Sequence, residues 1–278
     1  VAQCVVLPAP YERTSSYGLG SKYGPTAILE ASHQVELFDS TLLREPFTLC
    51  NGVCTAEALQ FEDNEDELAV IERIRRATSY WLDQKKFVVT LGGEHTTSLG
   101  CIMAHQERFD DLTIIQLDAH SDLRDEYEGS KYNHACVMRR LFDNDVRFIQ
   151  VGIRSQEKDE YTFQKEHNIP VFYAHAIHDK SFAGQDSWIQ DIIALTGKNV
   201  YVTFDCDMFD PSIIPSTGTP EPGGLNWYQV TRFLEALTQW RCLVGIDFTE
   251  LAPIEGLQHP QFTIAKLIQR VIGMKFTQ

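Results

Sequence analysis

The segment Thr113–Asp122, with the sequence TIIQLDAHSD, joins an apolar run to a cluster of metal-ligand side chains. Its first five residues are mostly apolar and β-branched, which is typical of a strand covered on both faces of a sheet. The same pattern occurs twice more: FVVTL (87–91) precedes GGEH (92–95), and VYVTF (200–204) precedes DCD (205–207). Ligands of open parallel sheets bind beyond the carboxyl ends of the strands, so the three segments predict one shared site.

The rest of the chain alternates strand-like and helix-like segments, which predicts an α/β sandwich. Further strands are expected at Cys4–Pro8, Arg147–Gly152, Val171–Tyr173 and Leu243–Phe248. Helical patterns cover Asn64–Lys86, Ser98–Phe109, Ala135–Asp143, Ser187–Thr196, Trp227–Trp240 and Pro260–Met274. No linker, repeat or low-complexity segment interrupts this alternation, so residues 1–278 are expected to form a single domain.

The composition argues against several classes of partner. The 278 residues include 24 Lys and Arg against 39 Asp and Glu, which gives a formal net charge of −15. So acidic a chain offers no basic stripe to a nucleic acid, and no run approaches the ~20 apolar residues of a membrane span. The first residues lack the features of a signal peptide, and seven dispersed cysteines suggest free thiols in a reducing compartment. We therefore expect a cytoplasmic protein with neither nucleic acid nor membrane as a partner.

The three strand-end segments together carry four carboxylates and two imidazoles. A single Asp after a strand is usually a turn or cap residue, and a single His can be a buried core residue. Four carboxylates at one sheet edge would instead repel one another unless cations neutralise them. Oxygen ligands with a minority of imidazoles suit Mn²⁺-like ions, and six ligands are too many for one ion with an open position. The sequence thus predicts a two-metal centre held by His95, Asp118, His120, Asp122, Asp205 and Asp207.

The motifs GGEH, DAHSD and DCD, in this order, resemble those of the ureohydrolases, the family of arginase and agmatinase. The resemblance covers nearly the whole chain, including PYERTSSYGLGSKYGP (10–25), STGTPEPGGL (216–225) and DFTELAP (247–253). The segment Asp122–Arg140 is similar to bacterial and archaeal agmatinase-like members. The resemblance implies a three-layer α/β/α fold around a mainly parallel sheet of about eight strands.

The resemblance also implies two Mn²⁺ ions and a role for each site residue. One ion would be held by His95, Asp118, Asp122 and Asp205, and the other by Asp118, His120, Asp205 and Asp207, so that Asp118 and Asp205 bridge. His134 matches the family's loop histidine, the expected proton shuttle, although by itself it would be read as a surface histidine. Glu250 matches the glutamate that binds the guanidinium, and Asp122 completes the expected catalytic residues. Thr219, Glu221 and Arg124 are expected to line the substrate pocket.

The reaction implied is hydrolysis of a guanidino compound to urea and an amine, with agmatine to putrescine, in polyamine biosynthesis, as the leading case. An acidic chain with acidic residues in the loop 123–128 favours a substrate that is cationic at both ends. Arg124 opposes this if it is free, because it would attract a carboxylate such as that of guanidinobutyrate. Paired with Asp125, Glu126 or Glu128, it would be structural.

Several alternatives stay open from the sequence. They include guanidinobutyrase, guanidinopropionase, formiminoglutamase and arginase activity, and more remotely a metal-dependent deacetylase or a catalytically silent regulatory subunit. The resemblance further predicts a homotrimer or homohexamer.

Overall fold

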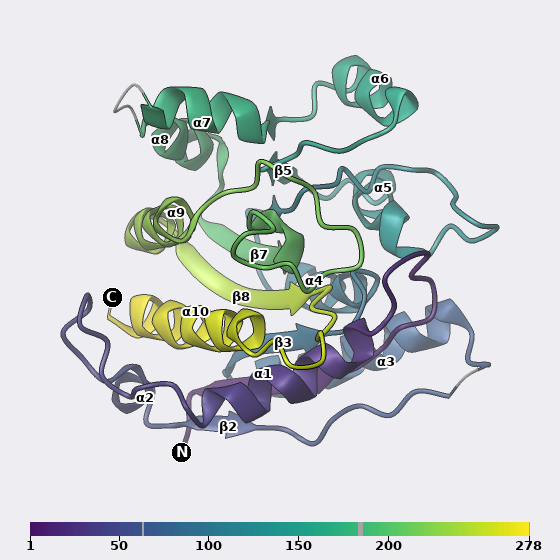
Figure 1. Cartoon of the computed structure of the whole chain (residues 1–278). Helices are drawn as coiled ribbons and strands as arrows, with labels where there is room; N and C mark the ends of the chain where they lie inside the picture. The colour runs from purple at the N-terminus through teal and green to yellow at the C-terminus, as the bar shows by residue number, and fades with distance from the viewer. Residues whose placement is uncertain (63, 183–185, 278) are drawn as a thin grey trace.

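The computed structural model describes residues 1–62, 64–182 and 186–277, and these residues form one sheet of eight strands (Figure 1). The strand order is β2-β1-β3-β8-β7-β4-β5-β6, and each pairing of neighbours is parallel. The strands are β1 (Cys4–Ala9), β2 (Val53–Thr55), β3 (Phe87–Gly92), β4 (Leu112–Leu117), β5 (Phe148–Val151), β6 (Val171–Phe172), β7 (Asn199–Asp205) and β8 (Cys242–Thr249).

Helices cover both faces of the sheet, which confirms the expected three-layer sandwich (Figure 1). One layer holds α1 (Gly24–Ser32), α7 (Ala174–Phe182), α8 (Ser187–Leu195), α9 (Trp227–Trp240) and α10 (His259–Phe276), with α2 (Pro46–Leu49) packed on α10. The other holds α3 (Glu67–Asp83), α4 (Thr97–Gln106) and α5 (Val137–Asp143). The ring of Phe163 in α6 (Lys158–Glu166) packs edge-on against Phe142 of α5, with centroids 4.8 Å apart.

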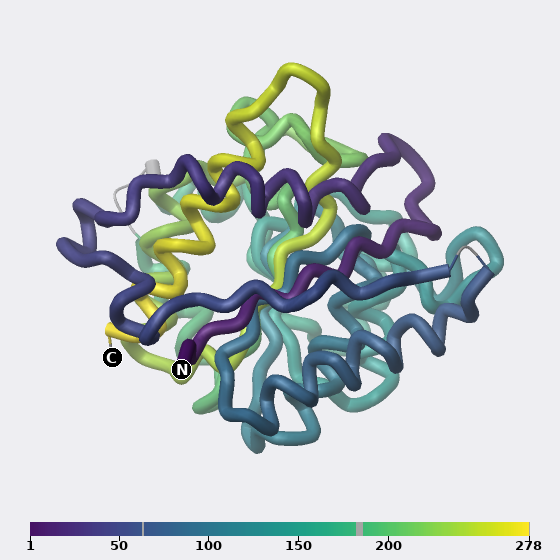
Figure 2. The backbone as a smooth tube through the Cα atoms, turned by 90° about the horizontal axis from the view of Figure 1, so that it is seen from below, coloured from purple at the N-terminus to yellow at the C-terminus, as the bar shows by residue number. Residues whose placement is uncertain are grey.

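The burial of the strands explains the apolar runs in the sequence. Every residue of β1, β3, β4 and β5 is buried, as expected for parallel strands covered by helices on both faces. The first and last described residues both lie on the side where the strands begin (Figures 1 and 2). The strand-end segments therefore meet at the opposite edge. Within the described ranges, none of the helices combines the length and apolar character needed to cross a membrane.

Five of the observed elements were not expected: β2, α1, α2, α6 and α7. All three residues of β2 are exposed at the edge of the sheet, so no apolar run marks the strand. The predicted helix over 64–86 begins at Glu67, because the Asp66 side chain accepts the backbone N–H groups of Leu68 and Ala69 and caps the helix there. The predicted helix over 135–143 begins with a 3₁₀ turn, His134–Cys136, before α5.

Candidate active site

Four neighbouring strands carry the predicted site residues to one edge of the sheet. β3 leads into His95, β4 leads into the segment 118–122, and β7 ends at Asp205. β8 lies between β3 and β7 and leads into Glu250. Of the six predicted ligands, five are buried and His120 is partly exposed. The parallel topology is therefore what gathers residues that are more than a hundred positions apart in the sequence.

Gly93 allows the chain to turn out of β3 towards His95. A side chain at this position would overlap the carbonyl oxygen of Tyr11. The backbone at Gly93 and Glu94 stays in close contact with that at Tyr11, because the N–H of Glu94 donates to the same carbonyl at 2.8 Å. Only glycine fits such an approach, so the GGEH motif supplies the turn as well as a ligand.

A first group of ligand atoms surrounds Nδ1 of His95. Its distances are 2.7 Å to Oδ2 of Asp122, 3.2 Å to Oδ2 of Asp118 and 3.8 Å to Oδ2 of Asp205. The ligand atoms of His95, Asp118 and Asp122 lie close enough together to hold one metal ion. On the other side of the ring, Nε2 of His95 lies 2.9 Å from Oγ1 of Thr203.

A second group is centred on His120, and Asp118 belongs to both. Nδ1 of His120 lies 2.8 Å from Oδ2 of Asp207 and 3.7 Å from Oδ1 of Asp118. Asp118 thus turns one oxygen to each histidine, as a bridging ligand would. Asp205 lies beside the first group but belongs to neither close set of three among the described residues. Its role as the second bridge stays a prediction.

Side chains two positions apart on a strand face the same side, so the DCD motif predicts that Asp205 and Asp207 converge on one strand face. That prediction was wrong, because the two aspartates converge through a turn. β7 ends at Asp205, and Cys206–Met208 form a 3₁₀ turn. Oδ1 of Asp205 accepts the N–H of Asp207 at 2.9 Å, which caps that turn. The Asp118 and His120 pair likewise lies beyond the end of β4 at Leu117.

The electrostatics of the site fit a group that binds cations. Burial, with the nearby charges of Asp207 and Asp122, raises the pKa of Asp118 to about 7. Burial and the charges of Asp207 and Asp118 raise the pKa of Asp205 well above its usual range. Burial opposes the charge on His120, but Asp207 and Asp118 raise the pKa of this imidazole to about 10. The carboxylates repel one another, and divalent cations would remove that repulsion. The oxygen and imidazole donors therefore fit divalent metal ions that accept mixed oxygen and nitrogen ligands.

Glu250 lines a cavity together with several of the predicted ligands. Its Oε1 accepts the backbone N–H of His95 at 2.7 Å, and Oε2 remains for a substrate. Burial and the charge of Glu94 raise the pKa of Glu250 to about 8. The residue has a positive φ of 60°, in the left-handed region.

A cavity of about 390 Å³ opens from the ligands to the surface and brings together all the predicted substrate residues. His134, Thr219, Glu221, Arg124 and Glu250 line it. Among the residues that the structure describes, seven carboxylates and one arginine line the cavity, and the carboxylates are Asp122, Glu157, Glu160, Asp205, Asp207, Glu221 and Glu250. Its volume is within the range of small-molecule sites.

Arg124 has a partner, but none of the three that the sequence suggested. Its guanidinium lies 3.1 Å from a carboxylate oxygen of Glu157, immediately before α6, and 4.4 Å from the centre of the Tyr127 ring. Asp125 instead pairs with Arg140 at 2.7 Å. Neither alternative from the sequence, a free Arg124 or an Arg124 paired within the loop 123–128, matches the structure, because α6, which the sequence did not indicate, places Glu157 against the loop.

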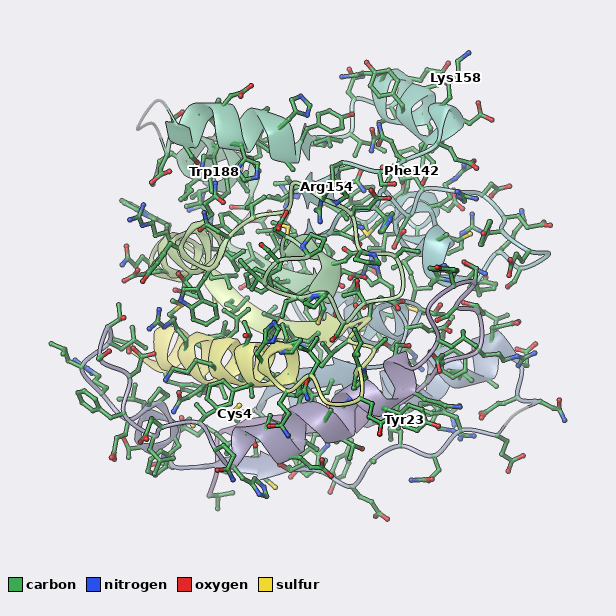
Figure 3. All side chains as sticks on the ribbon, in the orientation of Figure 1. Cys4, Tyr23, Phe142, Arg154, Lys158 and Trp188 are labelled. Carbon is green, nitrogen blue, oxygen red and sulfur yellow. The ribbon has the colours of Figure 1, made fainter. Side chains whose placement is uncertain are left out.

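Three further residues that organise the site were not recognised in the sequence. Glu94 is buried and accepts the backbone N–H groups of the loop 13–15. Thr14 of that loop contacts His134. Arg154, which follows β5 (Figure 3), donates to the backbone carbonyls of Asp207 at 2.6 Å and Glu221 at 2.8 Å, and so ties the ligand turn to the pocket loop. Only Glu94 had a signal, as a member of the GGEH motif.

Several known proteins with similar sequences are named as ureohydrolases or agmatinases. The N(1)-aminopropylagmatine ureohydrolase of a Synechocystis species is 39% identical, over 98% of this chain and 89% of that protein. The agmatinase of Pyrococcus horikoshii is 32% identical, over 98% and 92% of the two chains. The crystal structure of agmatine ureohydrolase of Thermoplasma volcanium superposes with a TM-score of 0.88 at 31% identity, covering 99% of this chain and 90% of that one.

The family assignment follows from the same comparisons. The sequence profile of the Arginase family matches residues 2–273. Arginase from Bacillus subtilis shares the fold, with a TM-score of 0.80 at 22% identity, over 98% of each chain. With its motifs at one sheet edge and its full-length similarity to named ureohydrolases, the chain belongs to the arginase family and is a ureohydrolase.

Proposed function

We propose that the chain is a binuclear manganese ureohydrolase that cleaves a linear guanidino polyamine to urea and the free amine. N(1)-aminopropylagmatine is the favoured substrate, and agmatine is the second candidate. One observation carries the choice: besides the proposed metal ligands, four carboxylates and one arginine of the described residues line the cavity, so the cavity favours a ligand with several positive charges. Relatives with both names support the two candidates.

The proposed metal site uses the two groups around His95 and His120, with Asp118 contributing to both. Asp205 is proposed as the second bridging ligand. Two Mn²⁺ ions, when bound, supply Lewis-acid chemistry and lower the pKa of water.

The residues around the ligands account for the remaining chemistry. Glu250 can hold the planar guanidinium through its free oxygen, because a carboxylate and a guanidinium form strong, directional hydrogen bonds. His134 then donates a proton to the leaving amine, so that the amine departs neutral rather than as an anion. Both residues line the cavity that contains the ligand groups.

The outer part of the cavity would bind the distal amines. Glu157, just before α6, and Glu221, in the pocket loop, line the cavity and are the proposed contacts, whereas both oxygens of the buried Glu160 already accept backbone N–H groups. The ion pair with Glu157 partly offsets the positive charge of Arg124, which reduces the repulsion that this arginine would exert on an ammonium group. Arginine itself would bring an α-carboxylate towards these acidic groups, which disfavours it as a substrate.

A urea-release panel tests the proposal. The purified, Mn²⁺-loaded enzyme would be assayed with N(1)-aminopropylagmatine, agmatine, arginine, guanidinobutyrate, guanidinopropionate and formiminoglutamate. We expect kcat/KM to be highest for the two polyamine substrates and lowest for those with a carboxylate. A preference for arginine or guanidinobutyrate would contradict the substrate assignment, and absence of urea from every substrate would contradict the activity.

The ion pair between Arg124 and Glu157 offers two matched variants for the same assay. Arg124→Ala should raise the preference for agmatine over guanidinobutyrate, and Glu157→Gln should lower it, because the first removes a cation and the second frees one. Exposed ion pairs contribute up to about 1 kcal/mol, so each ratio should change roughly 2- to 5-fold. Shifts of the ratio in the same direction in both variants, or no shift in either, would show that the pair does not act on the distal end. A homotrimer or homohexamer stays a prediction for light scattering to test.

A further inference from the structure

The side chain of Thr14 lies between Glu94 and His134. Its Oγ1 is 2.6 Å from Oε1 of Glu94, 3.0 Å from the backbone N of His134 and 3.3 Å from Nδ1 of the same histidine. Oγ1 of Thr96 is farther away, at 3.5 Å. One hydroxyl therefore joins a buried carboxylate to the ring of the proposed proton shuttle.

The direction of these hydrogen bonds follows from the donors and acceptors present. A hydroxyl has one hydrogen and two lone pairs. Oε2 of Glu94 already accepts the backbone N–H groups of Arg13 and Thr14 at 2.6 Å and of Ser15 at 3.2 Å, so this carboxylate acts as an acceptor. The short contact at Oε1 thus takes the hydroxyl hydrogen of Thr14, because a carboxylate is a stronger acceptor than the Thr96 hydroxyl.

The two lone pairs of Thr14 are then left for His134. The backbone N–H of His134 can only donate, and it uses one lone pair. The other faces Nδ1, and two acceptors in contact would repel each other, so Nδ1 must carry a hydrogen. The ring of Tyr127 meets His134 edge-on, at a centroid distance of 5.9 Å, and limits rotation of the imidazole.

We infer that Thr14, held by Glu94, fixes His134 in the Nδ1–H tautomer and leaves Nε2 as the atom that exchanges protons. The inference rests on the proposed function only where it gives His134 a proton to transfer. The imidazolium releases its Nε2 proton to the leaving amine and keeps its Nδ1 hydrogen on Thr14. A proton from solvent then restores the charged ring. Thr14 is thus a positioning residue, because the same Nδ1–H···Oγ1 bond persists in both protonation states.

Nuclear magnetic resonance of ¹⁵N-labelled protein tests the tautomer directly. The protein would be loaded with Zn²⁺, which is diamagnetic and accepts the same types of ligand, and studied at about pH 9, well above the pKa of an ordinary imidazole. The signals missing from His134→Asn identify His134. We expect Nδ1 to resonate as a protonated nitrogen and Nε2 as an unprotonated one. The opposite assignment would overturn the inference.

Two substitutions at Thr14 then test its role. Thr14→Val keeps the shape but removes the hydroxyl, and should give a mixture of tautomers. It should also lower kcat about 10-fold, a part of the ~10²–10⁴-fold that a general acid–base group contributes, with little change in KM. Thr14→Ser keeps the hydroxyl and should restore both the tautomer and kcat. Unchanged His134 signals in Thr14→Val would refute the role of Thr14.

The wild-type spectrum keeps this test separate from that of the proposed function. The expected tautomer, found together with full kcat in His134→Asn, would support the hydrogen-bond assignment and remove the shuttle from the proposed mechanism. The Nε2–H tautomer, found with a slow His134→Asn variant, would refute the assignment and leave the shuttle in place.

Discussion

Asp247 is a buried carboxylate behind the ligand groups, and Asp247→Asn should weaken both the fold and the metal site. Oδ1 of Asp247 accepts hydrogen bonds from Ser98 at 3.0 Å and Thr203 at 2.9 Å, and Oδ2 accepts one from Tyr201 at 2.7 Å. The hydroxyl of Thr203 is also 2.9 Å from Nε2 of His95. Asp247 is therefore connected to a proposed ligand through a single hydroxyl.

The magnitude follows from the three bonds. Asparagine keeps the shape, but its amide nitrogen must face either Tyr201 or the pair of Ser98 and Thr203, so at least one hydroxyl loses its acceptor. A hydrogen bond to a charged group contributes about 1.5–3 kcal/mol, and we expect the free energy of unfolding to fall by that amount. The corresponding fall in Tm is roughly 3–10 °C. Residues that orient a ligand typically contribute about 10- to 100-fold in metal affinity, which sets the second expectation.

Urea unfolding and metal titration of the same variants measure both effects. Tyr201→Phe is the matched control, because it removes the bond to Oδ2 and leaves those on the side of His95 intact. It should lower stability without changing metal affinity. Normal metal affinity in Asp247→Asn would refute the orienting role, and normal stability would refute the reasoning about unsatisfied hydroxyls.

Three further predictions concern the ligands, the guanidinium and a distant ion pair. Asp118→Asn should bind less metal than His95→Asn, because Asp118 belongs to both ligand groups. If metal analysis shows that the two variants lose equal amounts of metal, Asp118 is not a bridging ligand. Glu250→Gln should keep the hydrogen bond from the backbone N–H of His95 and reduce kcat/KM roughly 10- to 150-fold, by the same factor for every guanidino substrate. A defect confined to one substrate would argue against guanidinium binding. Burial opposes the charge on Asp39, but the hydrogen bond from Arg270 lowers the pKa of this carboxyl group. The carboxylate therefore stabilises the fold at neutral pH, and this contribution is lost as the pH falls through the lowered pKa. The difference in unfolding free energy between wild type and Asp39→Asn should therefore be constant near pH 7 and decrease below about pH 4. A difference that persists in acid would exclude this linkage.

The sequence predicted the layered fold because central parallel strands are buried on both faces and therefore mostly apolar. The runs of β3, β4 and β7 show this directly, and each leads into a ligand motif. The exposed edge strand β2 and the polar helix α6 lack such runs. Their positions depend on tertiary contacts, which a single sequence does not reveal.

The ligand set was predictable because side-chain chemistry and strand order act together. The partners of His134 and Arg124 were not, because Thr14 is 120 positions from His134 and Glu157 caps a helix that the sequence did not indicate. The predicted backbone conformation was also wrong at Asp205 and Asp207, because a 3₁₀ turn rather than an extended strand brings the two carboxylates together. Residue types thus indicated the chemistry, and the loops between elements determined which groups touch.

Asp122 and Glu250 have positive φ values of 50° and 60°, a backbone region that costs ordinary side chains about 1 kcal/mol or more. Glycine or asparagine would occupy either position more easily. Selection of this enzyme for heat tolerance alone should therefore enrich such replacements and reduce activity along with them. Laboratory evolution of a more robust variant would have to hold these two positions constant and seek its gains elsewhere.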